Sequence, residues 1–249
     1  MKRACWAAPL GDCEGDLERA HLVSDCLWEG DTVGWADWTR DEPMMVGRGA
    51  LVAKIQCAHH NRILGEVDTV GGGLFKELTA LHRWTNETGD GGIREFVEFD
   101  GWLAERWFLV TMINKVVRHD LAKWHEGSPA HSPPLALIES AFGRKYLPYP
   151  MGLWSCESER GGPAKGRIGM IRSTAKFGAN GEVLGNLYEF AFMRLLLWAS
   201  PTLPPEPLAQ TYRQQYSKFI GPKGTAGMRI NFGDVPGPVV VTEWRSFPK

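Results

Sequence analysis

The 249-residue sequence predicts an α+β protein, and three observations support this class. Two short strand-like runs, at 21–23 and 50–56, precede a helical pattern. Residues 102–117 carry apolar side chains on most faces, as expected of a helix that other elements surround. Residues 178–181 read Gly-Ala-Asn-Gly between two β-type runs, and Asn-Gly in that context is a strong hairpin signal.

The first predicted domain starts with a loop that carries two cysteines, followed by the strand at 21–23. A polar loop over 28–49 leads to the second strand at 50–56. Apolar residues then recur every three or four positions from His59 to about Trp84. This spacing predicts a helix, and we interpret the glycines at 71–73 as helix punctuation rather than a phosphate-binding loop.

The glycine-rich run at 89–92 is the predicted linker, so the expected domains cover 1–88 and 89–249. Beyond the buried helix, the second domain is expected to hold a loop (128–134), a helix (134–142), two hairpin arms (167–177 and 182–198) and a loop-like tail with one strand (239–241). The pattern predicts a central helix against an antiparallel sheet.

The formal net charge of −1 hides two parts of opposite charge. Residues 1–139 hold 14 basic and 22 acidic side chains, a net charge of −8, whereas residues 140–249 hold 14 and 7, a net charge of +7. A basic half favours an anionic partner, although an ordinary solvated surface can carry the same charge. The hydrophobic content of 43% excludes a disordered or fibrous chain.

The sequence predicts neither a membrane span nor a secretory signal. The most apolar stretch, 190–199, is short and contains Arg194, and the apolar run near the N-terminus is interrupted by Pro9. Four of the five cysteines lie in the first quarter of the chain: Cys5, Cys13, Cys26 and Cys57. In an intracellular chain such clustering indicates a metal site before a disulfide, and the cytoplasm is the expected compartment.

A structural zinc ion takes four sulfur or nitrogen ligands, usually delivered as two closely spaced pairs. Cys5 with Cys13, and Cys57 with His60, form two such pairs and predict a structural zinc site. His59 or Cys26 is the alternative for one ligand. The competing interpretation is that Cys5 and Cys57 are small buried hydrophobic residues.

His21 lies between the two pairs, and Asn61 directly follows the second pair. This layout resembles the HNH nuclease family, whose ββα-metal fold places a histidine on the first strand and Asn or His at the start of the helix. The matching text is Cys5, Cys13, RAHLVS at 19–24 and CAHHN at 57–61. Residues 59–72 and 100–114 are also similar to uncharacterised bacterial proteins with an HNH-like zinc region and an α+β second part.

The resemblance implies a metal-dependent endonuclease that hydrolyses DNA phosphodiesters. His21 would be the general base that activates water. Asn61 would be a ligand of a catalytic Mg²⁺ or Mn²⁺ ion. Asp68, two helical turns later, would share a face with Asn61 and could be a second ligand. The alternative is a catalytically inactive, zinc-stabilised module that binds nucleic acid or protein.

Two departures from the family pattern bear on catalysis. The family has Asp or Glu directly before the base histidine, whereas this chain has Ala20. Glu18 is near, and on a regular strand it would point to the same face as Ala20. The orienting asparagine is also absent, since residues 22–60 contain no Asn, although an aspartate of the long loop could substitute: Asp31, Asp37 or Asp41.

A basic stretch in the second part gives a candidate nucleic-acid surface. Arg167, Arg172 and Lys176 fall on a glycine-rich loop and the following strand, where Arg172 and Lys176 would share a sheet face and line phosphates. DNA is the expected partner, with other nucleic acids as an alternative. A solvated sheet face is the competing interpretation.

Overall fold

The structure is a computed structural model of the chain, and it describes most of the sequence. The described residues are 4–27, 32–35, 44–86, 92–93, 97–119, 123–124, 132–156, 172–189, 194–205, 211–213, 216–221, 224–233 and 241–245. The predicted linker falls largely outside these ranges.

The N-terminal part is a strand pair followed by helices. Strand β1 (Leu17–His21) pairs antiparallel with β4 (Val52–Cys57), and α1 (Ala58–Ile63) follows β4 directly. After a break at Leu64, α2 (Gly65–Asn86) continues as the longest helix described. The predicted helix is therefore present, and it passes through the glycines at 71–73.

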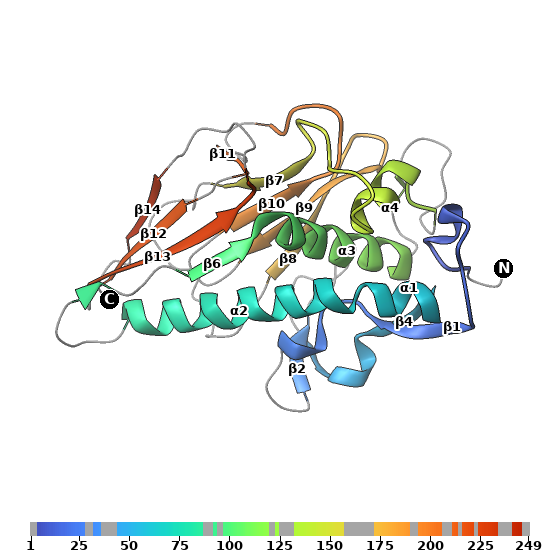
Figure 1. Cartoon of the computed structure of the whole chain (residues 1–249), viewed down its shortest axis with the longest axis horizontal. Helices are drawn as coiled ribbons and strands as arrows, with labels where there is room; N and C mark the ends of the chain where they lie inside the picture. The colour runs from blue at the N-terminus through green and yellow to red at the C-terminus, as the bar shows by residue number, and fades with distance from the viewer. Residues whose placement is uncertain are drawn as a thin grey trace.

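Helix α3 (Gly101–His119) is central, as its apolar composition predicts. It lies against α2 and against α4 (Leu135–Ala141), and it also packs against the strand β10 (Arg194–Trp198) (Figure 1). Trp107, Phe108 and Met112 on α3 are almost completely buried. Burial around the helix axis explains why its sequence is apolar on several faces.

Two five-stranded sheets complete the fold, together with the short pair β2 (Thr32–Trp35) and β3 (Met44–Gly47). The first sheet is antiparallel, in the order β11-β7-β10-β9-β8. The second is mixed: β12 and β13 are antiparallel, whereas β14, β5 and β6 pair parallel. The strands are β5 (Gly92–Ile93), β6 (Val97–Asp100), β7 (Gly152–Ser155), β8 (Arg172–Phe177), β9 (Val183–Glu189), β10 (Arg194–Trp198), β11 (Thr211–Tyr212), β12 (Tyr216–Gly221), β13 (Gly224–Asn231) and β14 (Val241–Arg245).

The α+β class is confirmed, and the β8–β9 hairpin forms around the predicted turn. Three expectations about strands were wrong. The first strand ends at His21 instead of starting there, because the polar run from Leu17 pairs with β4. The expected loop at 28–49 contains the β2–β3 pair. The expected loop-like tail contributes four strands, because its apolar residues pair with distant partners such as β6 and β7.

One cluster of buried hydrophobic residues extends from Cys5 to Phe232 and includes side chains from both parts of the chain. Ile55 of β4, Leu74 of α2 and Phe232 after β13 all belong to it. Among the described helices, none is long and apolar enough to cross a membrane. Two of the predicted zinc ligands, Cys5 and Cys57, belong to this cluster.

Candidate metal centre

Cys5 and Cys13 reach the same place because the chain reverses between them. The 3-10 helix η1 (Ala8–Leu10) ends at Gly11, whose φ of 83° lies in the left-handed region that favours glycine. The backbone N–H of Trp6 donates to the carbonyl of Ile55, which holds this segment against β4. The turn therefore carries both cysteines to the end of β4.

The other two residues come from the junction of β4 and α1. Cys57 is the last residue of β4 and the N-cap of α1, and His60 lies in the first turn of the helix. The backbone N–H groups of Ala58 and His59 donate to the carbonyls of Asp16 and Glu14. These bonds fix the helix start against the chain that follows Cys13.

The structure brings all four predicted ligands together. The Nδ1 atom of His60 lies 3.1 Å from the Sγ of Cys57, 3.4 Å from that of Cys5 and 3.6 Å from that of Cys13. One ligand atom from each residue lies within 4.8 Å of every other. None of the four cysteines that the structure describes forms a disulfide. The arrangement is compatible with a bound metal ion.

The three thiols differ in acidity. Desolvation opposes ionisation of Cys57, but hydrogen bonds with the backbone of His60 and Glu14 outweigh it, so the pKa of Cys57 is lowered. Desolvation, followed by the charge of the Cys5 sulfur, raises the pKa of Cys13 to about 12. Desolvation also raises the pKa of Cys5. A cation bound at the centre of the group would lower the pKa of the coordinating thiols, since a coordinating thiol is deprotonated.

His60 presents one ring nitrogen to the sulfurs and the other to a carboxylate. Its Nε2 donates to Oδ1 of Asp12 at 2.9 Å, and Asp12 also accepts a hydrogen bond from Arg144. Burial lowers the pKa of His60 even though Asp12 acts in the opposite direction. The imidazole is therefore favoured in its neutral form, which is the form that binds metals.

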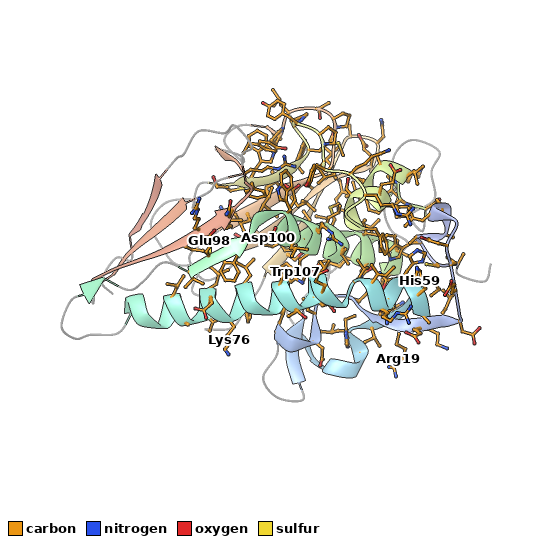
Figure 2. All side chains as sticks on the ribbon, viewed as in Figure 1. Arg19, His59, Lys76, Glu98, Asp100 and Trp107 are labelled. Atoms are coloured by element: carbon orange, nitrogen blue, oxygen red, sulfur yellow. The ribbon has the colours of Figure 1, made fainter. Side chains whose placement is uncertain are left out.

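The structure tests one of the two alternative zinc ligands, His59, but not the other, Cys26. His59 is absent from the group that contains the three cysteines, and its Nδ1 is buried without a hydrogen-bond partner in the structure. It belongs instead to a second group, with Asp12 and His60. Figure 2 shows His59 at the end of the molecule where α1 lies. The side chain of Cys26 lies outside what the structure describes.

The predicted base, His21, lies at the end of β1, opposite Val52 of β4. Its backbone carbonyl accepts a hydrogen bond from Nδ2 of Asn114 on α3, at 2.9 Å. The Oδ1 atom of the same asparagine accepts bonds from the side chains of Trp6 and Gln56. Asn114 thus joins the loop that carries Cys5, β1 and β4 to the central helix, and the sequence patterns did not single it out.

Asp68 on α2 is close enough to His21 for the imidazole charge to act on it. Burial raises the pKa of Asp68, while the hydroxyl of Ser24 and the charge of His21 lower it. Oγ of Ser24 donates to Oδ1 of Asp68 at 2.6 Å, and Nε1 of Trp107 donates to Oγ of Ser24 at 2.7 Å. Trp107 lies between α2 and α3 in Figure 2. A carboxylate therefore lies near His21, although it comes from α2 and not from position 20.

The two predicted cation ligands bond to different partners: Asp68 to Ser24, and Asn61 to Glu18. Nδ2 of Asn61 donates to Oε2 of Glu18 at 3.1 Å. A β-bulge between Glu18 and Arg19 interrupts the alternation of β1, so Glu18 is exposed whereas Ala20 is buried. The expectation that Glu18 shares a face with Ala20 was wrong for this reason.

The predicted basic surface is described only in part. Arg167 lies outside the described residues, as do the candidate loop aspartates 31, 37 and 41. Arg172 and Lys176 lie four residues apart on β8, and Lys176 is half-buried. The side chain of Arg172 is not described.

Comparison of the chain with protein-family models, with curated proteins and with solved structures finds no match in any of the three.

Proposed function

We propose that Cys5, Cys13, Cys57 and His60 bind one structural zinc ion. Zn–S bonds of about 2.3 Å and Zn–N bonds of about 2.0–2.1 Å in a tetrahedron separate sulfur from nitrogen by about 3.5 Å. The sulfur-to-nitrogen distances of 3.1–3.6 Å fit this value. Four protein ligands fill the coordination shell, so the zinc has a structural role and leaves no position for substrate.

We further propose that this zinc-stabilised ββα unit is an HNH-like endonuclease that hydrolyses DNA phosphodiesters. The observation that carries the proposal is the position of His21 at the end of β1, within electrostatic range of the carboxylate of Asp68, in the same strand–helix unit as the candidate metal centre. An imidazole is suited to take a proton from water near neutral pH.

The chain also offers hard oxygen donors for a catalytic cation. Mg²⁺ in nucleases and polymerases is held by one or two carboxylates together with substrate phosphates and water. We assign Asp68 as a carboxylate ligand of this cation. The side chains of Glu18 on β1 and Asn61 on α1, which are hydrogen-bonded to each other, supply further oxygens. Mg²⁺ or Mn²⁺ would stabilise the negative charge that develops on the leaving oxygen.

A second candidate function is binding of nucleic acid or protein without catalysis. Ala20 is 1% exposed and packs in the core, so position 20 offers no oxygen to a cation. Among the described residues, no group of three His, Cys, Asp or Glu side chains gathers around His21. These observations favour a scaffold that keeps the structural site and has lost the catalytic one.

A cleavage assay separates the two functions. Purified protein is incubated with supercoiled plasmid and Mn²⁺, alongside His21→Ala and a control, Lys54→Ala, which changes an exposed residue of β4. The nuclease proposal predicts nicking by the wild type and the control and a loss of at least about 100-fold in His21→Ala. Equal cutting by wild type and His21→Ala, or cutting by neither, contradicts it.

A further inference from the structure

The loop that joins α4 to β7 is both basic and aromatic. Residues 142–151 read FGRKYLPYPM, with two cations and no acidic residue. Tyr146 is 67% exposed and Tyr149 is 65% exposed, and these are the two most exposed large hydrophobic side chains described. Two exposed tyrosine rings in one short loop form a candidate contact surface, since tyrosine is enriched at interfaces.

Both tyrosine rings rest on further rings instead of projecting freely. The ring centroid of Tyr146 lies 4.0 Å from that of Trp102 on α3. Tyr149 meets the ring of Tyr212 edge to face at 5.2 Å, and Trp154 lies 6.1 Å away. The exposed faces are therefore held in place before any ligand arrives, which reduces the entropy cost of binding.

A buried ion pair connects the two ring groups. The guanidinium of Arg213 lies 4.3 Å from the ring of Trp102 and 4.8 Å from that of Tyr212. Two hydrogen bonds, of 3.0 and 2.8 Å, hold Arg213 to the buried carboxylate of Glu105. The rings of Trp102 and Tyr212 are thus linked to α3 through Arg213 and Glu105.

A small cavity opens beside Tyr146. Trp102 and Tyr146 border it together with Ser140, Arg106 and Lys145. This cavity is too small to enclose a base, so the exposed ring faces and not a pocket form the proposed contact surface.

Cations flank the rings on the solvent side. Lys145 is 64% exposed, and its Nζ lies 2.7 Å from Oε2 of Glu139. Exposed ion pairs of this kind contribute little, so a phosphate can replace the carboxylate. Arg144 contacts Asp12, the carboxylate that holds His60, and this contact ties the loop to the candidate metal centre.

We propose that residues 142–151 bind single-stranded nucleic acid. Bases stack on Tyr146 and Tyr149, and Lys145 contacts the backbone phosphates, the combination that proteins use for unpaired strands. A duplex does not expose its base faces, so the rings favour a single strand. The inference rests on the proposed function only in taking nucleic acid as the ligand, because it requires no catalysis at His21.

Binding to a labelled 20-nucleotide oligo(dT) and to a duplex of the same length tests the proposal. Fluorescence anisotropy is measured at 50 mM salt without Mg²⁺ or Mn²⁺, so no cleavage occurs. Tyr146→Ala and Tyr149→Ala should each weaken binding of the single strand by about 5- to 100-fold. Tyr146→Phe, which keeps the ring, should bind like the wild type. Lys145→Gln should reduce the slope of log affinity against log salt by about 0.7.

Phe177→Ala provides the matched control, since Phe177 is a 44% exposed aromatic residue outside the loop, at the end of β8. It should leave the affinity unchanged. Any of three results overturns the proposal. The first is equal affinity for duplex and single strand, and the second is wild-type binding by both alanine variants. The third is no binding by the wild type at 100 μM protein, which is about the weak end of non-specific binding. The cleavage assay at His21 is read separately, so failure of one proposal does not imply failure of the other.

Discussion

At the scale of single residues, His60 connects the candidate zinc centre to the rest of the protein. One ring nitrogen faces three sulfurs, and the other donates to Asp12, which in turn holds Arg144 after α4. Such carboxylate partners fix the tautomer and orientation of a metal-binding histidine. The spacing of Cys57 and His60 predicts the ligand pair, but Asp12 was not predicted because its role depends on a contact with His60, 48 positions away in the chain.

Lys115 gives a prediction about pH at the same scale. It is 4% exposed, its Nζ lies 5.8 Å from the centre of the Tyr188 ring, and burial lowers its pKa to about 7 from 10.5. The unfolded state therefore binds more protons than the folded state between these two values, and stability rises with pH in that interval. We expect the free energy of unfolding to increase by about 2 kcal/mol from pH 7 to pH 9.

Urea unfolding at several pH values measures this rise. Lys115→Met should remove most of it and should be more stable than the wild type at pH 7. Lys76→Met, which changes an exposed lysine of α2, should keep it. The same pH dependence in wild type and Lys115→Met would show that Lys115 does not carry the effect.

At the scale of elements, the crossing of α2 and α3 depends on one glycine. A Cβ atom at Gly71 would lie 2.0 Å from Nε1 of Trp107, so no larger residue fits there. The same indole donates to Ser24, which donates to Asp68 near His21. The close approach of the two helices thus helps to position the candidate catalytic carboxylate.

Gly71→Ala should therefore destabilise the protein by about 2–3 kcal/mol through overpacking. Gly73→Ala is the matched control on the same helix, because its Cβ would meet nothing nearer than a Phe99 carbon at 3.9 Å. It should stabilise the protein by about 0.5–1 kcal/mol, since glycine is a poor helix former. Chemical denaturation of both variants measures the difference, and equal effects would contradict the role given to Gly71.

Features with a local sequence pattern could be predicted, whereas features that depend on distant residues could not. Apolar spacing was sufficient to place α2, α3 and α4, because a buried helix face has a local period. The four candidate ligands could be predicted from spacing, since the pairs are short-range features. The bulge at Glu18, the role of Asn114 and the mixed sheet could not, because each depends on pairing between residues distant in the chain.

At the scale of the whole molecule, the candidate metal centre and the central helix share one hydrophobic cluster. Cys5 and Cys57 belong to that cluster, as do Trp107 and Ile230. Asn114 adds a polar contact between α3 and the loop that carries Cys5, through the hydrogen bond from Trp6. Because these contacts depend on the turn that carries Cys5 and Cys13, loss of the metal should lower the stability of more than the N-terminal segment.

The charge division along the sequence is also explained in part at this scale. The candidate centre and His21 lie in the acidic part, whereas the aromatic loop at 142–151 lies in the basic part and reaches the centre through Arg144 and Asp12. An acidic catalytic unit that acts on a polyanion needs cations from elsewhere in the molecule. The proposed loop supplies one of them, Lys145, since Arg144 is held by Asp12.

The metal content of the purified chain tests the central claim, that Cys5, Cys13, Cys57 and His60 form a zinc centre. Elemental analysis should find about one zinc per chain in the wild type and in Cys156→Ser, which changes a buried cysteine outside the group. Cys57→Ser should hold less than about a third of an equivalent and should unfold at a lower temperature. Less than about half an equivalent in the wild type, or the same content in Cys57→Ser, would contradict the account.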